Sequence, residues 1–395
     1  MPASAPVPLD ARALGLLSLG HVAADTCQGA VAGLLPFLIA QRGLSYAEAT
    51  SLVLAATLAA SVVQPAFGVI ADRRSWPWLM PAALLLAGAG LAAVGFLPSY
   101  PATFATVVLS GLGVAAFHPE AARRAGGASG SRPATGMSLF SVGGNAGFAL
   151  GPLLVIVLVG TLGLHGTLGL LAVPLIAATA LVAGRGHLDG VAVAARRRAR
   201  AGADRWAPFG RLSGAVALRS VVYFGLLAFV PLYVARTLGD GAAAGSAALT
   251  VMLVAGAIGT LIGGRVADRI GPRVMFAASM AALPPLLLVL LLVPGALLPA
   301  LALIGAASVA TFSVTVVIGQ ELLPSRPGVA SGITLGLAMG IGGLGASLLG
   351  FLADADGIRA ALATLVVLPI PALLLAISLP GRPTAPTGSA PAPRA

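Results

Sequence analysis

Apolar residues run along this chain in long blocks, and the polar residues are gathered between the blocks. Stretches 77–117, 133–184 and 274–320 contain no Asp, Glu, Lys or Arg. A helix needs about 20 apolar residues to cross the hydrocarbon core of a bilayer, so each stretch can hold two spans joined by a turn. The pattern therefore predicts helical hairpins in a membrane.

Breaks at proline, glycine and charged residues divide the chain into twelve predicted spans. They lie at about 12–40, 47–71, 77–97, 102–122, 134–160, 164–184, 213–235, 246–267, 273–294, 297–319, 328–353 and 358–379. We expect an all-α membrane protein with twelve transmembrane helices in two six-helix halves, residues 1–184 and 213–380. Residues 185–212 are the predicted cytoplasmic linker. The tail 381–395, rich in Pro, Ala, Gly and Ser, is predicted to be disordered.

Composition leads to the same class of protein. Hydrophobic residues make up 58% and charged residues 9% of the 395 residues, whereas soluble domains carry about 25% charged residues. Too few polar side chains exist to cover a globular surface, so lipid must surround most of the chain. The single cysteine, Cys27, excludes a disulfide framework. Because the first apolar run lacks a basic start and a cleavage site, we expect it to be retained as a helix.

The 23 basic residues are all arginine, and the net charge is +11. If both termini are cytoplasmic, only Arg42, Arg236 and Arg359 fall in external loops, which leaves 20 of the 23 inside. Short basic loops resist translocation, so this asymmetry predicts that both ends lie in the cytoplasm. The arginines sit at helix ends and in the linker, which indicates membrane topology and not nucleic-acid binding.

One polar signature occurs twice, with an offset of 196 residues, at Gly68, Asp72 and Arg73 and at Gly264, Asp268 and Arg269. A glycine near a helix end permits close approach of a neighbouring helix, while Asp and Arg can pair or contact helix termini. We interpret the signature as a gate that holds one face of the protein shut. A plain helix stop would explain one copy, but it explains two equivalent copies poorly.

Glycines at a spacing of four form a groove on the span 134–160, at Gly143, Gly147 and Gly151, with Pro152 following. A second groove lies on the span 328–353, at Gly332, Gly336, Gly340 and Gly343. Such grooves let another helix backbone lie close. They can serve bending or rocking during gating, or tight packing alone, and the sequence leaves both interpretations open.

The first predicted span carries His21, Asp25 and Gln28 at positions i, i+4 and i+7, which places them on one helix face. Ionisable groups at membrane depth are rare and usually serve a transport pathway. We predict a proton or substrate site around Asp25. The alternative is a buried hydrogen-bonding strut.

His118 and Glu120 lie in the fourth predicted span, two residues apart and separated by Pro119. Two positions differ by about 200° around a helix, so both can face one cavity only if the proline distorts the turn. Glu120 is the stronger candidate for proton exchange, because a carboxylate in a low-dielectric site can take up protons near neutral pH. The alternative is a salt bridge from Glu120 to Arg123 or Arg124.

Arg219 lies early in the seventh predicted span, with Tyr223 one turn further on. A guanidinium inside a span can bind an anionic group through two parallel hydrogen bonds. An anchor that reaches out to the inner surface is the alternative. Three further polar residues are predicted to line or gate the substrate path, namely Asn145, Gln320 and Glu321.

The two parallel halves resemble the major facilitator superfamily, whose loop after the second helix carries the Gly-x-x-x-Asp-Arg pattern. Gly147 to Pro152 is similar to the superfamily's antiporter motif, although Leu153 and Leu154 replace its trailing glycines. Within the superfamily, the chain resembles the fosmidomycin-resistance efflux family. The segments that carry this likeness are His21 with Asp25 and Gln28, Gln64-Pro65, Phe117-His118-Pro119-Glu120, Val142-Gly143-Gly144-Asn145, Gln320-Glu321-Leu322-Leu323-Pro324 and Gly342-Gly343-Leu344-Gly345.

This resemblance implies a proton-driven exporter of the bacterial inner membrane that works by alternating access on a small phosphonate-like anion. Many drug and proton antiporters carry an arginine in the fourth helix where this chain has Val107. Coupling through that arginine is therefore excluded. Asp25 and Glu120 become the expected proton carriers, with His21 and His118 beside them.

Two other functions stay open, proton-coupled uptake of an anionic nutrient and a membrane sensor without transport. We expect no enzymatic activity, cofactor or metal, because the His and carboxylate residues form no recognisable signature for a metal or a nucleophile. A chain without lysine cannot carry the Gly-x-x-x-x-Gly-Lys motif of ATP-binding loops. The expected partners are the lipid bilayer, protons and a small-molecule substrate, and the chain is expected to be a monomer.

Overall fold

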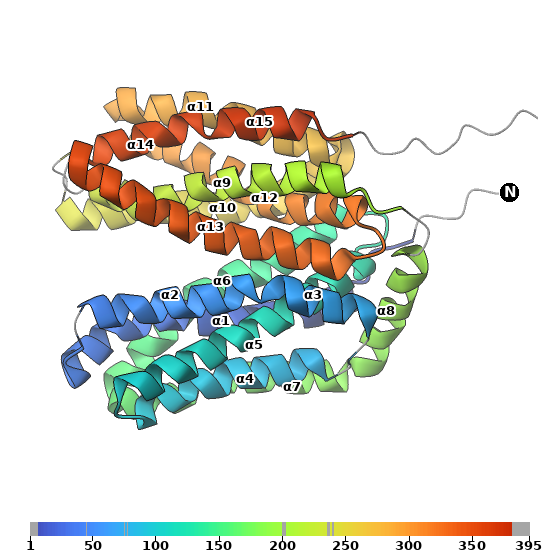
Figure 1. Cartoon of the computed structure of the whole chain (residues 1–395), viewed down its shortest axis with the longest axis horizontal. Helices are drawn as coiled ribbons and strands as arrows, with labels where there is room; N and C mark the ends of the chain where they lie inside the picture. The colour runs from blue at the N-terminus through green and yellow to red at the C-terminus, as the bar shows by residue number, and fades with distance from the viewer. Residues whose placement is uncertain are drawn as a thin grey trace, which may run out of the picture.

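The computed structural model describes residues 7–44, 46–74, 76, 78–199, 203–234, 238 and 241–380. Within these ranges the chain is helical and contains no β-strand. Figure 1 shows two bundles of long helices, with one short helix beside them at one end. Arg236, residues 200–202 of the predicted linker and the predicted tail 381–395 lie outside the described residues.

The first bundle is built by the N-terminal half. Its elements are α1 (Ala11–Arg42), α2 (Tyr46–Val62), α3 (Gln64–Arg73), α4 (Leu79–Ala93), η1 (Val94–Phe96), α5 (Tyr100–Ala128), α6 (Pro133–Leu162), η2 (Gly163–Leu171) and α7 (Ala172–Ala183). α2 and α3 follow each other directly, and the break falls at Val63. Pro65 lacks the amide hydrogen that would bond to the preceding turn, which explains the break.

The second bundle is built by the C-terminal half. Its elements are α9 (Trp206–Leu232), α10 (Gly241–Ile270), α11 (Pro272–Leu292), η4 (Pro294–Ala296), α12 (Leu297–Leu322), α13 (Pro327–Asp356), α14 (Ile358–Val367) and α15 (Pro369–Ile377). Helix α8 (Arg185–Ala199) joins the two bundles within the predicted linker.

α9 begins at Trp206, well before the start that the sequence pattern predicts. Pro208 falls in its first turn, where a missing amide hydrogen costs no helical bond. The early start has a consequence for Arg219. This residue lies in the middle of α9, so the prediction that it sits early in the span was wrong.

Ten stretches of the described residues are long and apolar enough to cross a membrane. One of them, Pro133–Ala183, contains both α6 and the following η2–α7 segment, and α1 is not among the ten. Large apolar side chains face outward, as at Phe351, which is 74% exposed. These features confirm an all-α membrane protein, and they are consistent with twelve crossings.

The start of α1, the end of α15 and α8 all lie at the same end of the bundles (Figure 1), which we call the terminal end. The two halves pack against each other through α3 with α13 and α6 with α10. Gly68 of α3 lies against the backbone of Gly328 at the start of α13, and Gly264 of α10 lies against Ser138 of α6. Glycine at both positions lets helices of different halves approach closely.

Candidate functional site

His21, Asp25 and His118 form one cluster in the N-terminal half. His21 Nε2 lies 3.3 Å from Asp25 Oδ2, and His118 Nε2 lies 3.2 Å from Asp25 Oδ1. His21 and Asp25 come from the middle of α1, and His118 comes from α5. The predicted polar face of α1 therefore contacts His118 of α5.

The second nitrogen of each imidazole is bound to a backbone carbonyl. His21 Nδ1 lies 2.8 Å from the Phe140 oxygen, and His118 Nδ1 lies 2.8 Å from the Val114 oxygen. A carbonyl oxygen only accepts, so both Nδ1 atoms carry hydrogen and donate it. The Nε2 atoms that face Asp25 therefore hold either a lone pair or an added proton. The ring of His21 also stacks on Phe140, with ring centroids 4.1 Å apart.

Pro119 is accommodated inside the continuous helix α5, and His118 and Glu120 point to different partners. Glu120 is 1% exposed and accepts hydrogen bonds from Arg123 at 2.8 Å and from Arg124 Nε at 2.6 Å. Arg124 Nη1 also donates to Asp189 of α8 at 3.1 Å. Of the two interpretations for Glu120, the structure contains the salt bridge, and it does not bring Glu120 to Asp25.

Helix α6 approaches α1 through glycines. The backbone of α1 lies against Gly143 at Ser18, against Gly147 at Val22 and against Gly151 at Thr26. A Cβ atom added at Gly144 would lie 2.5 Å from His21 Nε2 and 2.6 Å from Asp25 Oδ2. The groove predicted on this helix therefore packs within its own half, and Gly144 makes room for the cluster.

The groove on α13 has a different partner. Gly332 and Gly336 lie against the backbone of Gln64 and Ser61, which belong to the other half. Gly342 faces Phe224 of α9. α13 thus uses glycine on two sides, toward its own half and toward the opposite half.

Arg219 is 1% exposed and lies in the middle of α9. Its guanidinium carbon lies 3.8 Å from the ring centroid of Phe312, and Nη1 makes long hydrogen bonds to Thr311 and Thr315 at 3.3 and 3.5 Å. Among the described ion pairs none includes Arg219, and its Nε has no hydrogen-bond partner there. Such a buried charge is costly unless an anion meets it. The surface-anchor interpretation of Arg219 is excluded by its burial.

Tyr223 packs against Phe312, the residue that also contacts Arg219, with the two ring centroids 5.2 Å apart. Gln28 is 8% exposed, and its Oε1 has no hydrogen-bond partner among the described residues. Asn145 is exposed on α6. The structure therefore joins Tyr223 to Arg219 and leaves Gln28 on the helix face that carries Asp25.

Each aspartate of the repeated signature binds the N-terminus of a helix in the other half. Asp72 accepts from the Gly328 and Val329 amides at 2.8 and 2.9 Å. Asp268 accepts from the Ala134 and Thr135 amides at 2.9 and 2.8 Å, and from the Thr135 hydroxyl at 2.6 Å. A carboxylate both caps the orphan amides of a helix start and complements the positive end of its dipole. These contacts join the halves at the starts of α13 and α6.

The arginines of the signature, Arg73 and Arg269, are exposed and take no part in this capping. Gln320 donates from Nε2 to the Ala122 carbonyl of the other half at 3.0 Å and to Ser331 at 2.9 Å. Glu321 pairs with Arg273 at 3.3 Å. The structure does not bring Gln320 and Glu321 to Arg219. Gln320 instead adds to the contacts between the halves.

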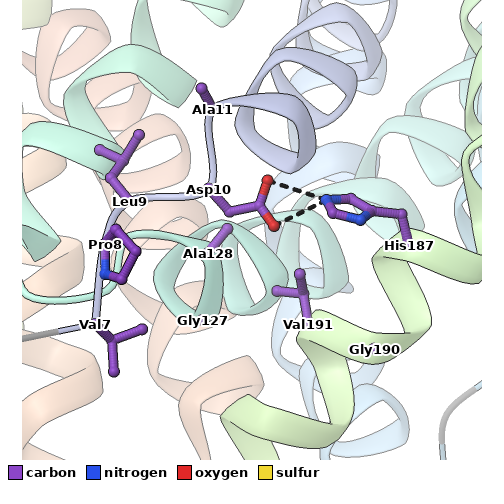
Figure 2. A pocket seen from close by; sticks show the side chains of 10 residues that line it. All are labelled: Val7, Pro8, Leu9, Asp10, Ala11, Gly127, Ala128, His187, Gly190 and Val191. Atoms are coloured by element: carbon purple, nitrogen blue, oxygen red, sulfur yellow. Dashed lines mark hydrogen bonds and ion pairs between the residues drawn. The ribbon is translucent and has the colours of Figure 1, made fainter. Parts of the chain in front are cut away.

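A cavity of about 560 Å³ lies at the terminal end between the N-terminal segment, the end of α5 and α8 (Figure 2). His187 Nε2 lies 2.8 Å from Asp10 Oδ2 there, and Asp10 Oδ1 caps the Ala13 amide at 2.9 Å. Burial works to raise the pKa of the Asp10 carboxyl, but the bonds from Ala13 and His187 outweigh it and hold the pKa below 3.8. None of the candidate transport residues lines this cavity.

The model of the Major Facilitator Superfamily matches residues 17–344 and 212–395. The chain belongs to the major facilitator superfamily. This superfamily member is 30% identical over 372 residues to the Fosmidomycin resistance protein of Escherichia coli (strain K12), which covers 91% of each chain. It is 31% identical over 377 residues to the Uncharacterized MFS-type transporter YfnC of Bacillus subtilis (strain 168), over 91% of this chain and 90% of the relative. The predicted membership of the fosmidomycin-resistance family is confirmed.

Two solved structures share the fold of this superfamily member. FucP in the outward conformation superposes with a TM-score of 0.70 and 15% identity, covering 92% of this chain and 97% of FucP. The human organic anion transporter MFSD10 (TETRAN) gives a TM-score of 0.71 and 16% identity, covering 93% and 100%. At these identities the likeness concerns the fold.

The sequence pattern did not predict several residues that lie at these sites. Thr311, Phe312 and Thr315 lie around Arg219. Thr311 and Thr315 are one turn apart on α12, so their hydroxyls face one side, and this spacing could have indicated a polar site. Gly144 was noted only as part of a glycine run. Its role depends on α1 and α6 being neighbours, which no local pattern reveals.

Proposed function

We propose that this transporter exports a small anion, such as a phosphonate antibiotic like fosmidomycin, in exchange for protons across the bacterial inner membrane. The relative named Fosmidomycin resistance protein, matched over 91% of this chain, supports the cargo class. The single observation that carries an anionic cargo is Arg219, a buried guanidinium in mid-helix without an ionic partner among the described residues.

The substrate site is proposed around Arg219, Tyr223, Thr311 and Thr315. A guanidinium offers two parallel N–H groups that match the oxygens of a phosphonate or carboxylate. Phe312 covers one face of the guanidinium, so the anion would approach along its edge, where Nε has no partner. Binding an anion there would offset the cost of burying the charge.

The proton site is proposed at Asp25 with His21 and His118. Their Nε2 atoms face carboxylate oxygens, so a proton on either nitrogen would convert a contact of two lone pairs into an attractive ion pair. Glu120 becomes the weaker candidate of the two carboxylates, because two arginines already stabilise its charged form. We propose that Glu120 instead neutralises and positions Arg123 and Arg124.

Alternating access is proposed to proceed by making and breaking the contacts of Asp72 and Asp268. Both join the halves, so they must separate for the face on which they lie to open. With both termini in the cytoplasm, as the arginine distribution predicts, this face is the cytoplasmic one. The closed contacts then correspond to an outward-facing state, with Gly147, Gly151 and Pro152 keeping α6 and α1 together as a unit.

The proposal can be tested in proteoliposomes that carry an imposed pH gradient. Labelled fosmidomycin should move against its own gradient in the direction opposite to the protons, and an uncoupler should stop it. Movement of substrate and protons in the same direction would establish symport instead. If anions bind but none of those tried shows proton-linked flux, the sensor function would remain as the explanation.

A further inference from the structure

We propose that His21, Asp25 and His118 form a binding site for one divalent transition-metal ion of the zinc class. The ligand atoms of these three side chains all lie within 4.8 Å of one another. The described structure places them at the middle of α1 and on α5, so an ion would tie these two helices together. Zn²⁺ would occupy the Nε2 atoms to which the proposed function assigns protons, so the ion and protons would compete for this cluster, and metal binding is tested by itself.

The first support is the orientation of the two imidazoles. Each donates its Nδ1 hydrogen to a backbone carbonyl, which leaves Nε2 as the metal-facing atom. Metal-bound histidines are held in this way, with the second ring nitrogen donating to a carbonyl or a carboxylate. Both outer bonds are in place at 2.8 Å before any ion arrives.

The second support is the spacing of the ligand atoms. Tetrahedral zinc with bonds of about 2.0–2.2 Å to nitrogen and oxygen places neighbouring ligand atoms about 3.3–3.5 Å apart. Each Nε2 lies at a similar distance from an Asp25 oxygen, at 3.3 Å for His21 and 3.2 Å for His118. Asp25 Oδ1 is buried and accepts no hydrogen bond in the described structure. A cation between the three side chains would take one ligand atom from each, the two Nε2 atoms and one Asp25 oxygen.

The donor set indicates which metals fit. Two imidazole nitrogens and one carboxylate suit zinc and its neighbours in the first transition row, whereas magnesium and calcium prefer oxygen ligands alone. Three protein ligands leave a fourth position for water or for an oxygen of a bound anion. The cluster is nearly buried, with side chains 8% exposed at His21, 16% at Asp25 and 5% at His118.

Zinc binding by the full chain, purified in detergent without a histidine tag, tests the proposal. Competition with a chromophoric chelator should give one high-affinity Zn²⁺ per chain. Loss of an outer-shell partner typically weakens metal binding 10- to 100-fold, so His118→Ala and Asp25→Asn, which remove a ligand, should weaken it at least about 100-fold. The matched control His165→Ala changes an exposed histidine and should bind like the wild type.

Co²⁺ provides a second measurement on the unaltered protein, which does not depend on the folding of any variant. A site with two nitrogens and one carboxylate should give the intense visible absorption of four-coordinate cobalt, and Zn²⁺ should displace it one for one. Failure of the wild type to bind Zn²⁺, or equal affinity in wild type, His118→Ala and Asp25→Asn that are all folded by gel filtration, would overturn the proposal.

Discussion

His118 Nε2 lies 3.2 Å from Asp25 Oδ1 and thereby links α5 to the middle of α1. With His21 on the other carboxylate oxygen, Asp25 is the centre of a polar cluster that lies beside apolar core residues of α1 and α5 such as Leu17, Ala24 and Phe117. Charged groups at this depth in a membrane cost several kcal/mol unless neighbours compensate them. Such groups usually serve a function, which makes this cluster a candidate functional site.

Asp25→Asn should abolish transport driven by a pH gradient while leaving the protein folded. An amide has nearly the same shape as a carboxylate but cannot carry the charge that attracts a proton to His21 or His118. We expect the initial rate in inverted vesicles to fall at least about tenfold, the loss that about 1.4 kcal/mol produces. The control Asp354→Asn alters an exposed carboxylate at the end of α13 and should keep the wild-type rate. Full activity of Asp25→Asn would assign proton transfer elsewhere.

Arg219→Ala should weaken binding of anionic cargo more than binding of a neutral analogue. Hydrogen bonds to a charged partner contribute about 1.5–3 kcal/mol, so the affinity for the anion should fall about 10- to 150-fold. Isothermal titration with both ligands measures the difference. Arg211→Ala is the matched control, because Arg211 is exposed and its guanidinium donates to the Ser378 carbonyl. Equal losses for both ligands in Arg219→Ala would indicate a structural role.

Asp72→Ala and Asp268→Ala should each loosen the helix start that the aspartate caps, because alanine has no side-chain oxygen to accept from the first amides. Loss of a capping interaction costs about 0.5–2 kcal/mol, so amide hydrogen exchange should accelerate about 2- to 30-fold. The acceleration should appear at Gly328 and Val329 in the first variant, and at Ala134 and Thr135 in the second. Unchanged exchange at these amides would show that the carboxylates do not hold the halves together in the membrane.

Gly144→Ala should destabilise the protein, because the new methyl group would collide with His21 and Asp25. Overpacking of this kind costs about 1–3 kcal/mol. Gly160→Ala on the same helix is the control, since nothing lies within 4 Å of its added Cβ and alanine favours helix. Thermal unfolding in detergent should give a lower midpoint for Gly144→Ala and an equal or higher midpoint for Gly160→Ala. A wild-type midpoint in Gly144→Ala would contradict the tight packing around the cluster.

Asp10 should contribute a pH-dependent part of the stability at the terminal end. Its pKa is lower in the folded protein than the ordinary value of 3.8. The contribution is therefore full above about 3.8 and is lost as the pH falls through the folded pKa. Asp10→Asn keeps the helix cap but removes the charge, so its unfolding midpoint should vary less than that of the wild type between pH 2 and about 5. Parallel curves for both proteins would exclude this role.

Local spacing predicted the parts of the site that lie on one helix. The positions i, i+4 and i+7 placed His21, Asp25 and Gln28 on one face, and the proximity of Arg123 and Arg124 to Glu120 allowed the salt bridge. His118 could not be joined to Asp25 from sequence, because that contact depends on how α1 packs against α5. The repeated signature could be found from the sequence, but which helix each aspartate caps is decided by packing between the halves.

The depth of Arg219 shows how a boundary error changes a chemical interpretation. The arginines before it suggested that the linker continues to residue 212, so Arg219 seemed close to the membrane surface. α9 tolerates Pro208 in its first turn and starts at Trp206, which moves the same guanidinium to mid-helix.

The two glycine grooves place different demands on the two halves. A bulkier residue at Gly147 would separate α6 from α1, which belong to the same half, so its effect would be on folding. A bulkier residue at Gly332 or Gly336 would instead prevent α13 from meeting Gln64 and Ser61 across the boundary. Each half could still fold, but under the proposed alternating access the balance between the two facing states would change. The groove on α6 is thus constrained by the stability of one half, whereas the groove on α13 is constrained by a contact that the proposed transport cycle must make and break.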